Sequence, residues 1–377
     1  MGIFGKKRLG MGCMRLPVLN EDDDSSFDVP QINRMTDIFL DRGFTYFDNA
    51  YMYHDYKSEE MIRDALVKRH SRDKFNIATK LPVHSVKSKA DNEKFFNEQL
   101  KKLGVDYFDF YLLHNLSFEK MDTVEKFKCF EFIDRKRQEG YIRHIGFSFH
   151  DKPELLKRLL SEHPEAEFVQ LQLNYLDWEN PAISSRRCYE TAKEFGKPII
   201  AMEPVKGGTL ATVPKSCEDL LIENRKNASI ASWAMNYLLG YPEIEMILSG
   251  MSNIEQLEDN METFEKCHLL NAREKELIER VKEEILNEGT VPCTSCRYCT
   301  DGCPKKIDIP RCLALYNAEL KALNRGFSTQ KMYYESLCDD TGSKASDCIS
   351  CGQCESICPQ HIRIISELKN VAKAFEN

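Results

Sequence analysis

Residues 293–304 read CTSCRYCTDGCP, and residues 348–359 read CISCGQCESICP. Each stretch holds four cysteines at the spacing C-x2-C-x2-C-x3-C and ends in proline. The two-residue gaps let three thiolates of one tight loop reach three iron atoms of a [4Fe–4S] cluster, and the fourth cysteine reaches the other cluster. The two stretches therefore predict a small domain that folds around two [4Fe–4S] clusters.

The spacing also assigns the ligands to the two clusters. A pair of zinc sites is the alternative, but zinc sites take cysteines in pairs rather than in runs of four that end in Cys-Pro. Ten of the fifteen cysteines lie between residues 293 and 358, and in a reducing compartment this concentration indicates metal binding. We expect one cluster on Cys293, Cys296, Cys299 and Cys358, and the other on Cys348, Cys351, Cys354 and Cys303.

The remaining cysteines are isolated in the sequence. Cys312 and Cys338 lie between the two motifs, in segments with helical periodicity. Free cysteine behaves as a small hydrophobic residue. We therefore expect the other five to be buried: Cys13, Cys129, Cys188, Cys217 and Cys267.

Composition limits the class of protein. The 377 residues carry a net charge of −8, which argues against binding to nucleic acid or to an anionic membrane surface. No apolar stretch is long enough to span a bilayer, and no apolar segment of a signal peptide follows the first lysines. We expect a cytoplasmic protein.

Before the cysteine motifs, short apolar runs alternate with longer amphipathic segments, which is typical of parallel strands joined by helices. Eight strand–helix units in about 270 residues favour a (β/α)8 TIM barrel over an open sheet. No G-x-G-x-x-G follows the first strand, which weakens a dinucleotide-binding open sheet. The predicted strands are Leu9–Leu16, Thr45–Ala50, Phe75–Leu81, Tyr107–His114, His144–His150, Phe168–Asn174, Pro198–Val205 and Met246–Met251. The predicted helices include Gln31–Arg42, Glu59–Lys68, Lys94–Leu103, Thr123–Lys136, Pro153–Leu160 and Ser229–Leu238.

Polar residues close nearly every predicted strand. In a barrel of this kind the active site lies at the carboxyl ends of the strands, so a ring of such residues predicts a site there. The ring comprises Asp48, Lys80, His114, Ser148, His150, Gln170, Asn174, Glu203 and Ser249.

Residues 8–265 resemble the aldo-keto reductases. The resemblance rests on the order and spacing of FDNAYMYH from Phe47, IATKL from Ile77, DFYLLH from Asp109, IRHIGFS from Ile142, QLQLNYLD from Gln170, EPVKGG from Glu203 and LSGMSNIEQLEDN from Leu248. The start LGMGCMRLP is similar to the branch of that family with an appended ferredoxin domain.

The resemblance implies a catalytic tetrad of Asp48, Tyr53, Lys80 and His114. Tyr53 would donate a proton to the carbonyl oxygen, Lys80 would tune its pKa, Asp48 would hold Lys80, and His114 would orient the substrate. Tyr51 and Tyr56 are competing tyrosines, and only the family spacing selects Tyr53. A plain salt bridge is the alternative role for Asp48 and Lys80, and a core histidine is the alternative for His114.

The resemblance also implies a nicotinamide cofactor, NADH or NADPH. The candidate contacts are Ser148, Gln170, Asn174, Gly250, Ser252, Gln256 and Asn260. The chain departs from the family pattern at several places. Ser252 and Gln256 stand where NADP-dependent members often carry a cation, Met202 where an aromatic residue often stacks on the nicotinamide, and Phe149 where an asparagine often lies. These departures leave FMN as an alternative occupant of the barrel.

We expect three segments: residues 1–270 as the barrel, 271–287 as a connecting helix, and 288–377 as a small α+β ferredoxin-like domain. Between the cysteine motifs, Pro310–Asn324 and Thr329–Leu337 are predicted to be inserted helices. Three functions follow. In the first, the barrel reduces a small carbonyl substrate with NAD(P)H, and the clusters link it to ferredoxin or another electron carrier. In the second, electrons from a ferredoxin reach a flavin in the barrel. In the third, the clusters are structural or redox-sensing in an interaction module.

Overall fold

The computed structural model describes residues 3–5, 7–20, 22–287, 289–322, 328–358 and 360–376. Pro359 of the second cysteine motif lies outside these ranges. So do residues 323 and 324 of the predicted helix Pro310–Asn324.

Eight parallel strands close into a barrel in chain order, and the last strand pairs with the first. The strands are β1 Leu9–Gly12, β2 Tyr46–Asp48, β3 Asn76–Leu81, β4 Phe108–Leu116, β5 Ile142–Phe149, β6 Phe168–Gln172, β7 Ile199–Met202 and β8 Ile244–Ser249. Each predicted strand overlaps one observed strand. The predicted (β/α)8 fold is therefore confirmed.

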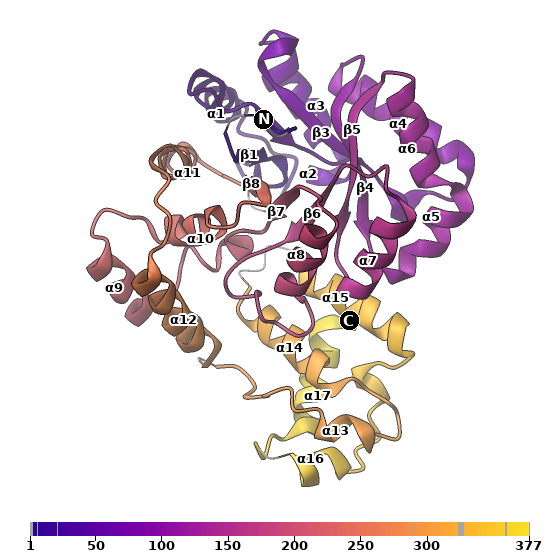
Figure 1. Cartoon of the computed structure of the whole chain (residues 1–377), viewed down its shortest axis with the longest axis vertical. Coiled ribbons are helices and arrows are strands. Elements are labelled where there is room, and N and C mark those ends of the chain that lie inside the picture. Colours follow the sequence, from indigo (N-terminus) through magenta and orange to yellow (C-terminus); the bar gives the residue numbers. More distant parts are fainter. Residues whose placement is uncertain are drawn as a thin grey trace.

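Helices surround the barrel (Figure 1). They are α1 Val29–Asp41, α2 Tyr53–Tyr56, α3 Ser58–Ile62, α4 Lys89–Leu103, α5 Met121–Phe127, α6 Cys129–Gln138, α7 Pro153–Glu162, α8 Ser185–Glu194, α9 Lys215–Asn224, α10 Ile230–Leu239, α11 Ile254–Lys266 and α12 Ala272–Asn287. One predicted helix, Thr123–Lys136, is wrong as a single element. Lys128 adopts a left-handed conformation (φ 58°), which interrupts helical hydrogen bonding and separates α5 from α6.

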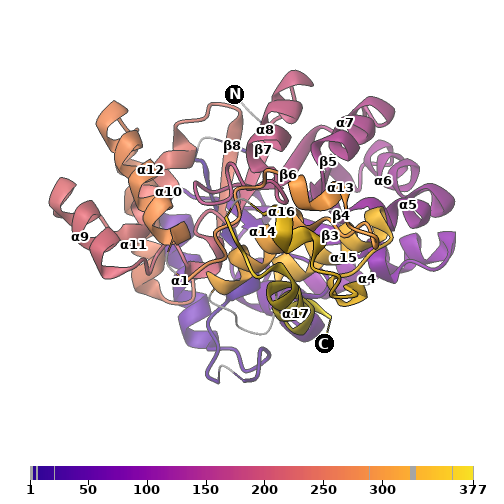
Figure 2. The ribbon, with the colours of Figure 1, turned by 90° about the horizontal axis from the view of Figure 1, so that it is seen from below.

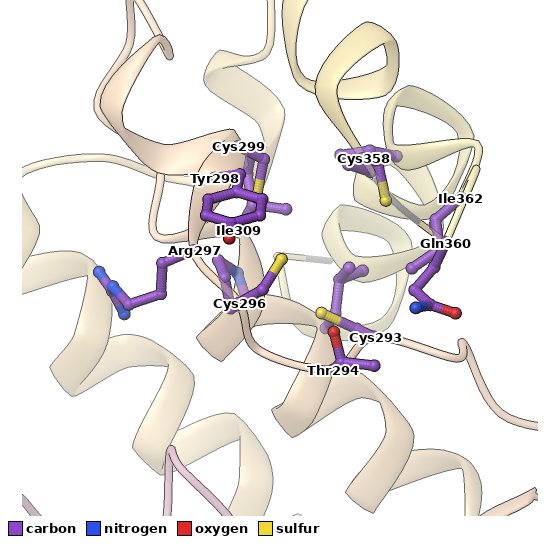
Figure 3. A pocket seen from close by; sticks show the side chains of 13 residues that line it. Cys293, Thr294, Cys296, Arg297, Tyr298, Cys299, Ile309, Cys358, Gln360 and Ile362 are labelled. Carbon is purple, nitrogen blue, oxygen red and sulfur yellow. The ribbon is translucent and has the colours of Figure 1, made fainter.

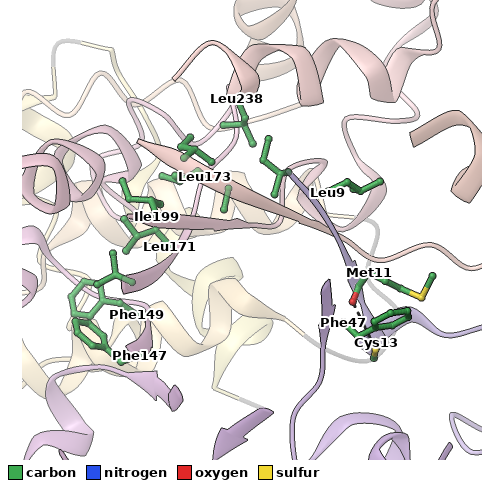
Figure 4. Packing of buried hydrophobic residues seen from close by; sticks show 14 of the residues in the cluster. Leu9, Met11, Cys13, Phe47, Phe147, Phe149, Leu171, Leu173, Ile199 and Leu238 are labelled. Atoms are coloured by element: carbon green, nitrogen blue, oxygen red, sulfur yellow. Dashed lines mark hydrogen bonds between the residues drawn. The ribbon is translucent and has the colours of Figure 1, made fainter. Parts of the chain in front are cut away.

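The barrel has two apolar layers. Between strands and helices lies the larger layer, which includes Leu9, Phe47 and Leu171 (Figure 4). Inside the barrel, Phe4 stacks on Phe110 with ring centroids 5.1 Å apart and closes the end at which the strands begin. The opposite end, where the strands finish, is left for polar side chains.

The described part of the second domain contains five α-helices: α13 Tyr298–Asp301, α14 Ile309–Leu320, α15 Thr329–Thr341, α16 Gln353–Ile357 and α17 Ile364–Phe375. No strand occurs in the part of residues 289–376 that the structure describes. Figure 1 places α14 and α15 between the barrel and the short helices α13 and α16, and the view from below shows the second domain in front of the barrel (Figure 2). Ala182 and Ile183, from the barrel loop before α8, belong to the core of this second domain.

Helix α12 falls in the predicted connecting segment 271–287, and the domain limits at 270 and 287 remain predictions. Among the described residues, no helix combines the length and the apolar character needed to cross a membrane.

Candidate active site and cluster sites

Four side chains from three successive strand ends meet at the mouth of the barrel. Asp48 is the last residue of β2, Lys80 lies near the end of β3, and His114 lies near the end of β4. Tyr53 begins α2, which directly follows β2. Because neighbouring strands are parallel, their carboxyl ends lie side by side and bring these residues together.

Lys80 is the centre of this group. Its Nζ atom lies 2.6 Å from Asp48 Oδ2, 2.6 Å from the carbonyl oxygen of Asn49 and 3.4 Å from the Tyr53 hydroxyl. The ring of His114 stands nearly perpendicular to that of Tyr53, with centroids 6.1 Å apart. Lys80 and Asp48 are buried, so water screens their interaction only weakly.

Burial sets the ionisation of these groups. Burial raises the pKa of the Tyr53 phenol, and the nearby Lys80 ammonium offsets part of that rise. Burial lowers the pKa of Lys80, but Asp48 and Tyr53 outweigh it and the net pKa lies above its usual value. Burial, reinforced by Lys80, holds the pKa of His114 well below its usual value. At neutral pH the site therefore holds a protonated phenol, an ammonium and a neutral imidazole.

The competing tyrosines lie elsewhere. Tyr51 donates a hydrogen bond to Glu98 Oε1 at 3.1 Å, and Tyr56 is half exposed. His54 has a left-handed backbone (φ 49°), the conformation for which glycine is best suited. Its ring compensates: Nδ1 lies 2.6 Å from the carbonyl oxygen of Asp24, and Nε2 accepts from the Leu16 N–H at 3.2 Å. This tether fixes the turn that presents Tyr53.

Several buried polar atoms at this end of the barrel have no hydrogen-bond partner. Unpaired buried polar atoms are costly, and they indicate a site that a polar ligand or water completes. These atoms are Asp48 Oδ1, His114 Nδ1, Asn115 Oδ1, His150 Nδ1, Gln170 Oε1 and Gln172 Oε1. These atoms fit a polar ligand at the mouth of the barrel.

Of the residues predicted to hold the nicotinamide, some keep a free polar atom and others are already hydrogen-bonded within the protein. Gln170 retains a free amide oxygen, and its amide nitrogen lies 3.4 Å from Met202 Sδ. Ser148 accepts a hydrogen bond from the Asn115 N–H at 2.7 Å. Asn174 is engaged internally, since its amide nitrogen donates to Asp177 Oδ2 at 2.8 Å and to the carbonyl oxygen of Glu203. Gln170 is therefore the member of this set best placed to bind a ligand.

The loop after β8 is held by its own polar residues. Gln256 Oε1 accepts from the Ser252 N–H at 2.8 Å, and Asn260 Nδ2 donates to Ser249 Oγ at 2.9 Å. Ser252 Oγ donates to the carbonyl oxygen of Arg15 at 3.1 Å. Gln256 and Asn260 thus shape the loop that begins at Gly250.

Arg15, three residues beyond β1, is a cation that the sequence reasoning missed. Arg15 packs closely against two glycines. If Gly250 carried a Cβ atom, that atom would lie 2.6 Å from Arg15 Cγ, and a Cβ atom on Gly207 would lie 3.8 Å from Arg15 Nη2. Its guanidinium forms no ion pair with any carboxylate of the described residues. Arg15 is the one cation of the segment LGMGCMRLP, and this was the sequence feature that could have identified it. Only the closed barrel, which brings β1 beside β8, shows which loops Arg15 adjoins.

The cluster cysteines line two cavities. The first cavity is lined by Cys293, Cys296, Cys299 and Cys358, and their sulfur atoms surround one space (Figure 3). The second is lined by Cys303, Cys348, Cys351 and Cys354. In each cavity three thiols come from one motif and the fourth from the other. The assignment of these cysteines as ligands of two clusters stays a prediction. The four thiols around each cavity fit a four-iron cluster.

The other cysteines lie away from these cavities. Cys312 and Cys338 are buried in α14 and α15. Of the five isolated cysteines, four are buried as predicted. The prediction that Cys267 is buried was wrong: it is exposed, at the C-terminal end of α11, where it adopts a left-handed conformation (φ 42°).

Residues 8–283 match the aldo/keto reductase family, and residues 292–362 match the 4Fe-4S dicluster domain. The chain belongs to the aldo/keto reductase family. This reductase is an oxidoreductase whose barrel carries an iron–sulfur dicluster domain.

Curated relatives agree with this assignment. The chain is 30% identical to the aldo-keto reductase str7 of Strobilurus tenacellus, over 69% of this chain and 82% of the relative. It is 24% identical to the uncharacterized oxidoreductase YqkF of Bacillus subtilis, over 74% of this chain and 93% of the relative.

Solved structures share the barrel fold. The holo form of aldo-keto reductase AKR11C1 from Bacillus halodurans superposes with a TM-score of 0.59 at 24% identity and covers 73% of this chain and 91% of its own. An aldo-keto reductase from Klebsiella pneumoniae, solved in complex with NADPH, gives a TM-score of 0.56 at 19% identity and covers 73% and 90%.

Proposed function

We propose that the barrel of this aldo/keto reductase interconverts a small carbonyl compound and its alcohol with NAD(P)H. We further propose that the dicluster domain exchanges single electrons with a separate carrier such as a ferredoxin. The observation that supports the first part is the buried Lys80 ammonium, which lies 2.6 Å from Asp48 and 3.4 Å from the Tyr53 hydroxyl. This is the arrangement that a proton donor at a carbonyl oxygen requires.

The chain's own residues supply the proton and the orientation. When hydride reaches the carbonyl carbon, negative charge develops on the oxygen, and Tyr53 donates its phenolic proton to that oxygen. Lys80 stabilises the resulting phenolate, and Asp48 keeps the ammonium in place. The neutral His114 donates a hydrogen bond that orients the carbonyl group. Solvent then returns a proton to Tyr53.

NADH or NADPH, when bound, supplies the hydride. Its carboxamide would meet Gln170 and Ser148, because Gln170 Oε1 is buried without a partner at the ends of the strands. The reductase from Klebsiella pneumoniae with the same fold was solved in complex with NADPH, which supports a nicotinamide nucleotide as the cofactor.

The phosphates of the cofactor would meet Arg15. In barrels of this fold a phosphate site is often built from the loops after the seventh and eighth strands, and Arg15 lies against Gly207 and Gly250 of those two loops. A guanidinium without a carboxylate partner suits a diphosphate. Arg15 would therefore supply the positive charge at the diphosphate, which NADH and NADPH share.

The dicluster domain provides one-electron chemistry when its clusters are bound. Ile309, the first residue of α14, lines both cavities. At the other end of α14, the carbonyl oxygen of Lys321 accepts a hydrogen bond from Thr209, in the barrel loop after β7. Twelve residues of α-helix rise about 18 Å, which gives the approximate separation between the cavities and the loop after β7.

Anaerobic purification of the holoprotein tests this function. The protein is analysed for iron and flavin, then mixed with NADPH or NADH and 4-nitrobenzaldehyde while nucleotide absorbance and the EPR signal of the clusters are recorded. Nucleotide consumption that requires the aldehyde and is lost in Tyr53→Phe supports the barrel reaction. Cluster reduction by a reduced ferredoxin supports the electron-transfer part. No nucleotide consumption contradicts the barrel proposal, and a tightly bound flavin would make the ferredoxin-linked flavin reductase the better assignment.

A further inference from the structure

Helix α15 of the dicluster domain has two different faces. Tyr334, Leu337 and Cys338 pack into the core of that domain, where Tyr334 stacks on Phe375 with centroids 4.9 Å apart. A second set recurs at the i, i+3, i+4, i+7 and i+11 spacing of one helical face. It comprises Thr329, Met332, Tyr333, Ser336 and Asp340.

This second face contacts the carboxyl end of the barrel along its whole length. Thr329 donates to Glu203, directly after β7. The ring of Tyr333 lies edge-on to His150, directly after β5, with centroids 5.7 Å apart. Further along, Ser336 donates to Asp151 Oδ2 at 2.6 Å. The helix therefore crosses from the end of β7 to the end of β5 and is anchored at both.

Between these anchors, Met332 reaches the residue next to His114. Asn115 Nδ2 lies 3.6 Å from Met332 Sδ, and the amide oxygen of Asn115 has no partner. Met332 keeps part of its surface uncovered, whereas its neighbour Tyr333 is buried. The anchors thus hold an apolar, partly open side chain beside the strand that carries a tetrad residue.

We propose that Met332 is a specificity-determining residue that forms part of the wall of the carbonyl site and limits the size of the substrate accepted there. The inference rests on the proposed carbonyl reduction. Methionine is flexible and polarizable, and it suits an apolar group of variable shape. The substrate class is therefore a small carbonyl compound with an apolar substituent, and the dicluster domain supplies a wall that the barrel alone does not have.

The test compares the holoprotein with Met332→Ala and Met332→Phe on two aldehydes, propanal and 2-naphthaldehyde. Removal of apolar atoms from a binding pocket changes discrimination by roughly tenfold or more. We expect Met332→Ala to raise kcat/KM for 2-naphthaldehyde relative to propanal by about tenfold, and Met332→Phe to lower the same ratio. Glu335→Ala, an exposed substitution on the same helix, is the matched control and keeps the wild-type ratio.

A second measurement needs no turnover. Equilibrium dialysis of 2-naphthalenemethanol against the same four proteins reports binding of the alcohol, and iron content and circular dichroism report an intact fold. We expect Met332→Ala to bind this alcohol more tightly than Met332→Phe, with an unchanged Kd for NADPH. Equal aldehyde ratios and equal alcohol binding in all four proteins would overturn the assignment of Met332. If the wild type turns over no aldehyde, the proposed function fails while dialysis still decides the role of Met332.

Discussion

The Tyr53 hydroxyl lies 3.4 Å from the Lys80 ammonium, although 27 positions separate the two residues in the chain. The ammonium is itself held by Asp48 on the neighbouring strand. Tyr53 is thus the tyrosine of its segment that contacts a buried cation, whereas Tyr51 is bonded to Glu98.

Replacing Tyr53 by phenylalanine removes the proton donor and leaves the ring. General acid catalysis contributes roughly 10²- to 10⁴-fold to a rate, so kcat for aldehyde reduction should fall by about that factor. The Kd for NADPH, measured by fluorescence titration, should stay near the wild-type value. Tyr51→Phe is the matched control and should retain most of the activity; equal loss in both variants would show that Tyr53 is not the donor.

Replacing Arg15 by glutamine removes the cation between the loops after β7 and β8. A hydrogen bond to a charged group contributes about 1.5–3 kcal/mol, so the Kd for the nucleotide should rise by roughly 10- to 100-fold. Because we place Arg15 at the diphosphate, NADH and NADPH should weaken by similar factors in isothermal titration calorimetry. Arg34→Gln, on the exposed side of α1, should bind as the wild type does. A loss confined to NADPH would instead assign Arg15 to the 2′-phosphate.

Paired cysteine substitutions test the crossed grouping of ligands. Cys296 and Cys358 line the same cavity, so Cys296→Ala combined with Cys358→Ala should remove one cluster and retain about half of the iron. Cys296 and Cys303 line different cavities, so that double variant should lose both clusters. The reverse result would show that each motif ligates its own cluster. Cys267→Ala, at an exposed cysteine, should keep the full iron content.

Glu59 makes the stability of the barrel depend on pH. Its carboxyl accepts hydrogen bonds from Thr79 at 2.7 Å and Gln99 at 2.8 Å, yet burial raises its pKa from 4.5 to about 7. Between these two values the folded state holds a proton that the unfolded state has released, so stability is greatest below pH 4.5 and falls as the pH rises through 7. A rise of this size corresponds to about 3 kcal/mol.

Glu59→Gln keeps the hydrogen-bonding shape without the titration. Its melting temperature relative to the wild type should therefore rise by roughly 6 °C between pH 5 and pH 8, measured by circular dichroism on the anaerobic holoprotein. Glu60→Gln, at the exposed neighbouring position, should show no such trend. A difference between Glu59→Gln and the wild type that stays constant over this pH range would mean that Glu59 is ionised, or neutral, throughout.

The strands and the cluster cysteines could be predicted from the sequence because both are local patterns. Each strand shows as an apolar run, and three of four ligands in each motif lie within seven residues of one another. The helix break at Lys128 was not predictable in the same way, because lysine is a residue of good helix propensity and yet adopts a left-handed conformation there.

The hydrogen bonding at the mouth of the barrel could not be predicted in this way, because it joins residues that are far apart in the sequence. The motifs identified Asp48, Tyr53, Lys80 and His114, but no local pattern shows that the Asn174 amide is taken by Asp177 or that Gln170 keeps a free oxygen. Arg15 was overlooked because its two neighbouring loops lie about 190 and 235 residues further along the chain.

By itself, the sequence of this protein determined an eight-stranded barrel and a two-cluster domain, since periodicity and spacing act over a few residues. The candidate catalytic residues came from the resemblance to the aldo-keto reductases, and their roles stay predictions. Only the tertiary structure decided which cation adjoins the loops after β7 and β8, and that α15 covers the strand ends from β5 to β7. The physical reason is that these relationships are set by barrel closure and by packing between the two domains, which join residues hundreds of positions apart.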